Sequence, residues 1–527
     1  MRSPSVLLRF AAAVLTCTGL VAVAAPAASA QDSATQEVID LAVRGLGGED
    51  AVRAAAGFHV EAAGRTAIFD EGRRPGDTVS LADRFTATLD YAFDPAGDKL
   101  RVDSVRTSLG VPRPVSEIVD GRLGAITGND ANFAPPATKA MTSDRWAAVT
   151  REQRLFNPLL YIRPLLDDPS DARAVGTTSL FGRRHRILEV TSDAVAVRLF
   201  VEAGSGRITQ LRTLDHNYNR GDLATSVDFR GFRNVGQGVV FPVTVVLRQA
   251  GQVLHTERRS VATAVDSVDA SRFEFPAGVT PAFDAELADR GAKATEWLMT
   301  FVHLGFIKDG PADVIVPREV APGSTLIQGL ANQSMIIEQQ GGIVVAEAAL
   351  NSFRAEALIA FIEDRFPGKP IRYVTGSHHH SDHAGGMRPF VALGATAVVH
   401  ENAAGFYRRI FAARSSTLLP DRLDGSTVQA NVLKVPSRRP ITLDDPLRPV
   451  QVIAEPTTHA TTTILVFVPT EGVLFVNGDT YTPGGAPGPG AVSLQRTIEA
   501  NGLDVQWIVG GHGGVISYAD FLAALPA

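Results

Sequence analysis

Cysteine is almost absent from this sequence. The single cysteine among the 527 residues is Cys17, which lies in an apolar N-terminal stretch. If that stretch is removed on export, the mature chain can form no disulfide and offers no thiolate to a metal. For an exported protein this favours the bacterial periplasm or the medium, and a stability that comes from large hydrophobic cores.

The sequence also lacks a basic surplus and a second long apolar run. Fifty Lys and Arg residues stand against 56 Asp and Glu residues, which gives a formal net charge of -6. Such mild acidity gives no sign of nucleic-acid binding, which needs a basic face. The apolar run from Phe10 to about Ala25 is shorter than the ~20 residues of a membrane-spanning helix. We therefore expect neither a nucleic-acid partner nor a stable membrane span.

The first 30 residues have the pattern of a secretory signal peptide. Arg2 and Arg9 flank the start of the apolar run, and Ala28-Ser29-Ala30 is a small-residue cleavage site. Lipid attachment at Cys17 is the weaker alternative, because Val14-Leu15-Thr16 is a poor lipoprotein signal. The expected location is periplasmic or secreted, and the loss of the two arginines takes the net charge to -8.

The length predicts two domains, because single cores rarely grow to this size. The expected fold class is α+β. We predict a signal peptide at 1–30, an antiparallel β-rich domain at 31–283, a helical linker at 284–315 and a second domain at 316–527. Seven of the 12 histidines lie between His378 and His512, which places the chemistry in the second domain.

Alternating polar and apolar residues dominate the first domain and predict an antiparallel meander. Gly204-Ser205-Gly206 and Gln249 to Gln252 are expected to form hairpin turns. Helices are predicted before Gly47-Gly48 and from Ser143 to Leu166. A long sheet interrupted by apolar helices weakly resembles the half-barrel of lipoprotein-carrier domains, which would imply an apolar cavity for acyl chains. The alternative is a structural β-domain that shapes or covers the active site.

The stretch Thr375 to Gly386 holds four histidines and an aspartate within six positions. It follows the β-branched run Ile371 to Thr375 and precedes an apolar run, so it is expected in a strand-to-helix loop. Alternate side chains of an extended loop point the same way, so His378 and His380 can face together. Imidazole and carboxylate are ligands that zinc accepts. A polar loop without metal is the alternative for this stretch alone.

Three later residues strengthen the prediction of a metal site. His459 lies just before the apolar strand 464–468, Asp479 closes a second strand at 473–479, and His512 follows the strand 505–509. A layered or doubly wound sheet gathers such strand ends along one edge.

With these residues, the chain resembles the metallo-β-lactamase-fold hydrolase superfamily from about Val316 to the C-terminus. The resemblance rests on His-x-His-x-Asp-His at 378–383, on His459, on Asp479 and on Gly-His-Gly around His512. It implies an αβ/βα sandwich with two zinc ions: His378, His380 and His459 hold one, Asp382, His383 and His512 hold the other, and Asp479 bridges them. Iron or manganese could replace zinc.

The resemblance also implies a chemistry. A water shared by two zinc ions has a pKa lowered towards ~7 and becomes a hydroxide nucleophile at neutral pH. Asp382 is expected to serve catalysis as well as metal binding. Tyr481, two residues after Asp479, is a hypothetical hydrogen-bond donor to the substrate. Glu347 stands where the superfamily has an aspartate. It is therefore open whether this residue orients the metal ligands by hydrogen bonding as the aspartate would.

The prediction is therefore an exported, zinc-dependent hydrolase that cleaves an ester, lactone, thioester or sulfate ester of a small molecule. The alternative is a non-catalytic periplasmic lipid or acyl carrier with a structural metal domain. A β-lactamase is the weaker possibility, because some β-lactam hydrolysing members carry a cysteine ligand and others lack the bridging carboxylate that Asp479 supplies. The sequence determines neither the scissile bond nor the oligomeric state.

Overall fold

The structure is a computed structural model that describes residues 27–94, 97–108, 110–132, 134–192, 195–414 and 416–525. Most of the predicted signal peptide, residues 1–26, lies outside the described residues, and the first described helix, α1, begins at Ala27. Within the described residues, no helix is both long enough and apolar enough to span a membrane.

One antiparallel sheet organises the first half. Within the described residues it has thirteen strands in the order β6-β5-β4-β3-β2-β1-β15-β14-β11-β10-β9-β8-β7. Most neighbours in the sheet are also neighbours along the chain, so the predicted meander is confirmed, including the turns at 203–207 and 250–251. The strands are β1 (Gly57–Ile68), β2 (Val79–Ala92), β3 (Lys99–Ser108), β4 (Val111–Asp120), β5 (Leu123–Gly128), β6 (Ala137–Ala140), β7 (Ala172–Leu180), β8 (Arg183–Ser192), β9 (Val195–Glu202), β10 (Ile208–Asn217), β11 (Gly221–Arg230), β14 (Thr244–Gln249) and β15 (Gln252–Val265), with a small separate pair, β12 (Arg233–Asn234) and β13 (Val240–Phe241).

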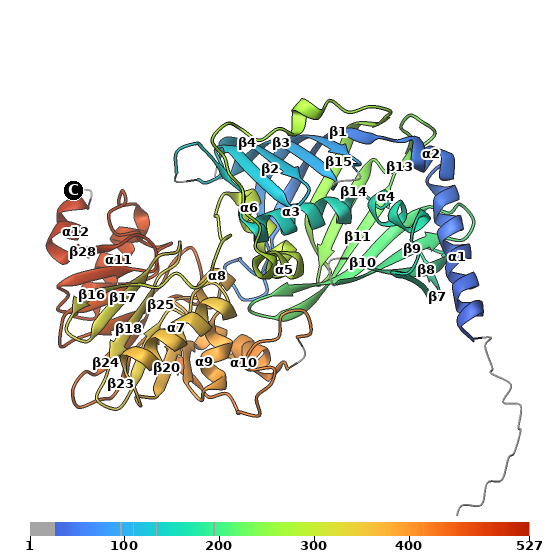
Figure 1. Cartoon of the computed structure of the whole chain (residues 1–527). Coiled ribbons are helices and arrows are strands. Elements are labelled where there is room, and N and C mark those ends of the chain that lie inside the picture. Colours follow the sequence, from blue (N-terminus) through green and yellow to red (C-terminus); the bar gives the residue numbers. More distant parts are fainter. Residues whose placement is uncertain are drawn as a thin grey trace, which may run out of the picture.

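The sheet curves around several helices (Figure 1). Buried side chains of β1, β3 and α6, among them Phe58, Val102 and Phe301, belong to one large hydrophobic core. The region 284–315, predicted as a linker, forms α5 and α6, and α6 is built into this core. The helices of this half are α1 (Ala27–Gly45), α2 (Glu49–Ala54), α3 (Ser143–Phe156), α4 (Leu159–Ile162), α5 (Ala285–Lys293) and α6 (Thr295–Leu304), with short 3-10 turns η1 (Pro164–Leu166) and η2 (Ala270–Phe273).

The second half is a four-layer αββα sandwich of two mixed sheets. The first sheet has the order β16-β17-β18-β19-β20-β21-β22, and the second has the order β23-β24-β25-β26-β27-β28. The strands are β16 (Val316–Ala321), β17 (Ser324–Gln328), β18 (Ser334–Glu338), β19 (Ile343–Ala346), β20 (Ile371–Thr375), β21 (Thr396–His400), β22 (Val432–Val435), β23 (Ile441–Leu443), β24 (Val450–Ala454), β25 (Ile464–Val468), β26 (Val473–Val476), β27 (Trp507–Gly510) and β28 (Val515–Ser517). The helices are α7 (Ser352–Arg365), α8 (Ser381–Ala384), α9 (Met387–Ala392), α10 (Ala404–Ala412), α11 (Pro489–Ala500) and α12 (Tyr518–Ala524), with the 3-10 turn η3 (Glu401–Ala403).

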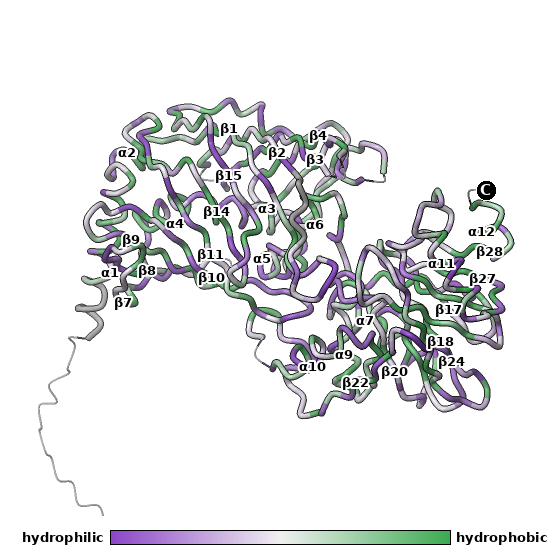
Figure 2. Tube along the Cα trace, turned by 180° about the vertical axis from the view of Figure 1, so that it is seen from behind, coloured by the Kyte–Doolittle hydropathy of each residue, from purple (hydrophilic) through white to green (hydrophobic). Residues whose placement is uncertain are grey.

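Three hydrophobic layers hold the sandwich together. The middle layer joins the two sheets through residues such as Val344, Val466 and Phe475. The outer layers pack α7, α9 and α10 on the first sheet and α11 and α12 on the second. Because both faces of these strands are covered, their residues read as continuous apolar runs, which are green in Figure 2.

The two halves pack against each other through polar and apolar contacts. Asp222 at the start of β11 accepts hydrogen bonds from the backbone N–H groups of Thr417 and Leu418 at 2.5 and 3.1 Å. Leu419 is buried in the core of the first half. The segment that follows α10 therefore packs against the large sheet.

Candidate metal centre

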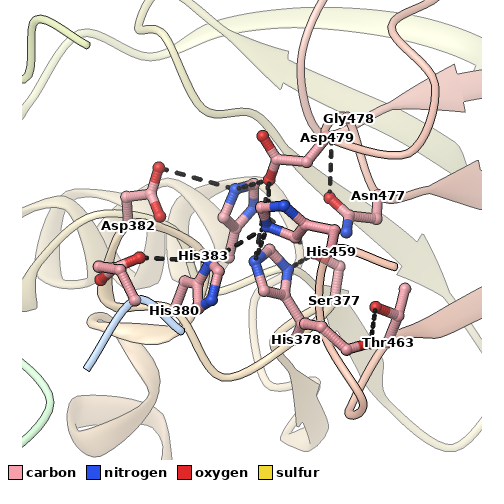
Figure 3. A network of polar contacts seen from close by, with 12 residues as sticks. Ser377, His378, His380, Asp382, His383, His459, Thr463, Asn477, Gly478 and Asp479 are labelled. Atoms are coloured by element: carbon pink, nitrogen blue, oxygen red, sulfur yellow. Dashed lines mark hydrogen bonds and ion pairs between the residues drawn. The ribbon is translucent and has the colours of Figure 1, made fainter. Parts of the chain in front are cut away.

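All predicted ligands lie beyond the carboxyl ends of four strands. His378, His380, Asp382 and His383 follow β20, His459 follows β24, Asp479 follows β26 and His512 follows β27. These ends meet at one edge of the sandwich, and Figure 3 shows the side chains of His378, His380, His383, His459 and Asp479 converging. A Cβ on Gly478 would lie 2.4 Å from the backbone nitrogen of His512, so this close approach of two strand ends requires glycine.

Three imidazoles form the first ligand group. The Nε2 atom of His459 lies 3.1 Å from Nε2 of His378 and 3.1 Å from Nδ1 of His380. Zn–N bonds of 2.0–2.1 Å in a tetrahedron separate ligand nitrogens by roughly 3.3 Å. The three nitrogens therefore fit one zinc ion, and we call this group the first subsite.

The second ligand group combines a carboxylate with two imidazoles. Single ligand atoms of Asp382, His383 and His512 all lie within 4.8 Å of one another. The Oδ2 atom of Asp382 lies 3.6 Å from Nε2 of His383, so this oxygen faces the group. We call these three residues the second subsite.

Asp479 lies between the two subsites. Its Oδ2 atom is 2.8 Å from Nε2 of His383, 3.5 Å from Nε2 of His459 and 3.8 Å from Nε2 of His378. Its Oδ1 atom is 3.7 Å from Nε2 of His512. The carboxylate thus contacts ligands of both groups. A residue that bridges two metal ions must lie in this position.

The centre is partly exposed to solvent at three of its ligands. The side chains of His459, Asp479 and His512 keep 34, 28 and 22% of their surface accessible. Those of His378, His380 and His383 are buried. A substrate would therefore approach past His459, Asp479 and His512.

Burial and charge set the protonation states of the ligands. Burial, followed by the neighbouring histidines, lowers the pKa of His378 well below its usual value and that of His380 to about 4, so both are neutral at pH 7 with a lone pair free for a metal. Burial alone would raise the pKa of Asp382, but His383 and Lys308 lower it. Burial also opposes ionisation of Asp479, yet His383 and His459 hold its pKa well below the usual range.

Three ligand rings are oriented by hydrogen bonds from their second nitrogen. The Nδ1 atom of His383 lies 2.6 Å from the buried carboxylate of Glu347, and Nδ1 of His512 donates to the Ala331 carbonyl at 2.8 Å. Nε2 of His380 donates to the Gly72 carbonyl at 2.9 Å. Such contacts fix which nitrogen is free to bind a metal. Glu347 therefore orients His383 although it stands where the superfamily has an aspartate.

Comparison with known protein families agrees with the fold of the second half. Residues 328–495 match the model of the metallo-beta-lactamase superfamily. The second half is a metallo-β-lactamase-fold domain. No curated protein matches the chain.

Three solved structures are similar to part of the chain at low sequence identity. A metallo-beta-lactamase from Pontibacter korlensis is 16% identical, with 40% of this chain and 95% of that chain covered and a TM-score of 0.30. The Flv1 flavodiiron core from Synechocystis sp. PCC6803 is 13% identical, with 40% and 59% covered and a TM-score of 0.32. The sec-alkyl sulfatase PisA1 variant is 18% identical, with 40% of each chain covered and a TM-score of 0.30. This chain thus spans 59% and 40% of the last two proteins.

The first half forms one wall of the metal centre in the metallo-β-lactamase-fold domain. The carboxylate of Glu71 accepts hydrogen bonds from the backbone N–H and the hydroxyl of Ser381, at 2.9 and 2.7 Å. Nε1 of Trp297 donates to the same hydroxyl at 2.9 Å. Nζ of Lys308 lies 2.8 Å from Oδ2 of Asp382. None of these contacts was predicted, because Glu71, Trp297 and Lys308 lie far from the ligand loop in the sequence and share no motif with it.

Two residues near the ligands point elsewhere. His379 is buried, but its Nδ1 atom contacts the Thr462 hydroxyl at 2.7 Å, and it belongs to neither subsite. The prediction that Tyr481 lies at the active site is corrected by the structure. Its ring packs edge-on against Phe521 of α12, 4.9 Å between ring centres, in the apolar layer outside the second sheet. Asp479 lies within a turn in which the backbone N–H groups of Thr480 and Tyr481 donate to the Asn477 carbonyl, and the Tyr481 side chain beyond it faces the core.

Proposed function

We propose that the protein is a zinc-dependent hydrolase that cleaves an ester, lactone, thioester or sulfate ester of a small molecule. The observation that carries this proposal is the pair of complete ligand groups that share Asp479 and are partly exposed to solvent at His459, Asp479 and His512. Structural metal sites are usually closed, whereas hydrolytic sites keep a position for water.

The residues of the chain support this chemistry in defined ways. Zinc, when bound, lowers the pKa of water and polarises the bond to be cleaved. The neutral imidazoles of the first subsite would hold one ion, and Asp382, His383 and His512 would hold the second. Asp479 would offset the repulsion between the two cations. Iron or manganese could occupy the same donors, because imidazole and carboxylate accept them as well.

We also propose that the protein is exported to the periplasm or the medium. The support is the sequence pattern of residues 1–30, with Arg2 and Arg9 before the apolar run and Ala28-Ser29-Ala30 at its end. Sequencing the N-terminus of the protein from its natural host should show Gln31 as the first residue. Met1 at the mature N-terminus would contradict export by this route.

The alternative of an acyl carrier is disfavoured by the interior of the first half. A cavity of about 70 Å³ lies inside the curved sheet, lined by residues that include Phe58, Tyr91, Phe156 and His255. For comparison, an engineered apolar cavity of about 150 Å³ binds a single benzene molecule. This cavity is therefore too small for an acyl chain.

The proposal is tested by proton release from the zinc-loaded mature chain with carboxyl esters, lactones, thioesters, β-lactams, sulfate esters and phosphodiesters. His380→Ala should lose both activity and bound zinc, because it removes a ligand of the first subsite. His379→Ala is the matched control: it removes a buried neighbouring histidine that belongs to neither subsite, and should keep both. Equal activity and zinc content in both variants would disprove the proposed function. If the protein binds two zinc ions but releases no protons with any substrate of the panel, the result would instead favour the non-catalytic carrier.

A further inference from the structure

We propose that Lys308 weakens the second subsite, so that the protein takes up one ion in the first subsite at low zinc and a second ion only at higher concentration. This inference rests on the proposed two-metal centre. It concerns a residue that lies between α6 of the first half and β16 of the second, outside every ligand motif of the sequence.

The ammonium group of Lys308 lies against the ligand oxygen of the second subsite. Its side chain is only 3% exposed, and Nζ is 2.8 Å from Oδ2 of Asp382. This is the same oxygen that faces Nε2 of His383 at 3.6 Å. The ammonium therefore competes for the atom that Asp382 would offer to a metal ion.

Asn332 holds the ammonium and the carboxylate in this arrangement. Nζ of Lys308 donates to Oδ1 of Asn332 at 2.5 Å, and Nδ2 of Asn332 donates to Oδ2 of Asp382 at 3.2 Å. Asn332 is fully buried, so the contact between Lys308 and Asp382 is shielded from water and salt. The position of the lysine is thus built into the fold.

The two subsites consequently differ in their charge environment. A divalent cation on Oδ2 of Asp382 would have a second cation as its neighbour on the same oxygen, and like charges repel strongly in a buried site. At the first subsite, His380 has the Gly72 carbonyl on its far nitrogen, and the carboxyl of Glu71, which carries no positive charge, lies 3.3 Å from Nδ1. Among the ion pairs of the described residues, no lysine or arginine contacts a first-subsite ligand.

The test is a zinc titration of the chelator-treated full chain against a competing chromophoric chelator, with bound metal counted by mass spectrometry. We expect two dissociation constants at least about tenfold apart in the wild type. Lys308→Met keeps the volume but removes the charge, and should tighten only the weaker site by about tenfold or more. Lys308→Arg keeps the charge and should retain the wild-type separation.

Lys369→Met is the control, because this lysine pairs with Glu338 in the same domain and contacts no metal ligand. Two wild-type constants within threefold of each other would overturn the inference, as would an unchanged separation in Lys308→Met. The wild-type titration shows whether the two dissociation constants differ, even if the Lys308→Met variant does not fold. Absence of any zinc binding would overturn the metal centre itself, and is therefore distinguishable from failure of the role of Lys308.

Discussion

The Gly72 carbonyl oxygen and the Nε2 atom of His380 lie 2.9 Å apart across the boundary between the two halves. A carbonyl only accepts hydrogen bonds, so His380 must carry its proton on Nε2, which leaves Nδ1 free to bind a metal. The loop between β1 and β2 thereby selects the tautomer of a residue more than 300 positions later in the chain. The β-rich half is part of the metal centre and does more than cover it.

We expect Glu71→Ala to weaken zinc binding at the first subsite about 10- to 100-fold, the usual range for residues that orient metal ligands. The variant removes the acceptor for Ser381 beside His380, so the ligand loop loses its support. Burial and Asp382 raise the pKa of Glu71 well above its usual value, so the neutral amide of Glu71→Gln should preserve most of the affinity. Zinc titration of both variants decides this, and equal losses in the two would refute the role assigned to the contact with Ser381.

Glu347 should affect zinc binding at the second subsite, because its side chain is long enough to contact His383. The carboxylate lies 2.6 Å from Nδ1 of His383, and the residue has a φ of 67°, a backbone conformation rare for a side chain of this size. Glu347→Asp shortens the side chain by one methylene, so it should break this contact and weaken the second subsite about tenfold or more. The prediction fails if the aspartate variant binds the second zinc ion as tightly as the wild type.

Tyr481→Phe should leave the rate with any substrate unchanged. The hydroxyl is buried in the apolar layer beside Phe521 and not at the metal centre. Because phenylalanine fills the same space without a polar atom, the melting temperature should stay equal or rise. A large fall in kcat with normal zinc content would restore the hypothesis that Tyr481 contacts the substrate.

Glu455 should make the stability depend on pH. It is buried after β24, and burial raises its pKa to about 8. The folded protein therefore keeps a proton that the unfolded chain loses above about pH 4.5. This contribution is fully present below that pH, and stability declines by roughly 1.4 kcal/mol per pH unit until the folded pKa is passed.

Glu455→Gln should remove this decline, because an amide does not titrate. Measured on the zinc-free protein, its melting temperature should exceed that of the wild type at pH 8.5 and match it near pH 4.5. Glu499→Gln, which changes an exposed glutamate on α11, is the control and should show no such trend. A difference between Glu455→Gln and the wild type that is the same at both pH values would contradict the assignment.

Much of the fold follows from patterns along the chain. Alternating residues, glycine turns and short connections predict the antiparallel meander, because each strand pairs with a neighbour in sequence. The ligand loop at 378–383 is equally local: its histidines are close in sequence, and strand ends in a layered sheet must meet at one edge. The prediction for Tyr481 was wrong because spacing along a turn does not fix the direction of a side chain.

The sequence by itself determined the αββα domain, its superfamily and a compact set of candidate ligands. Only the tertiary structure decided that Glu71, Gly72, Lys308 and Asn332 surround that set, and that the predicted linker is part of the first core. The physical reason is that hydrogen bonds and charge interactions act over a few ångströms in space. Residues hundreds of positions apart become partners only after both halves have folded and packed together.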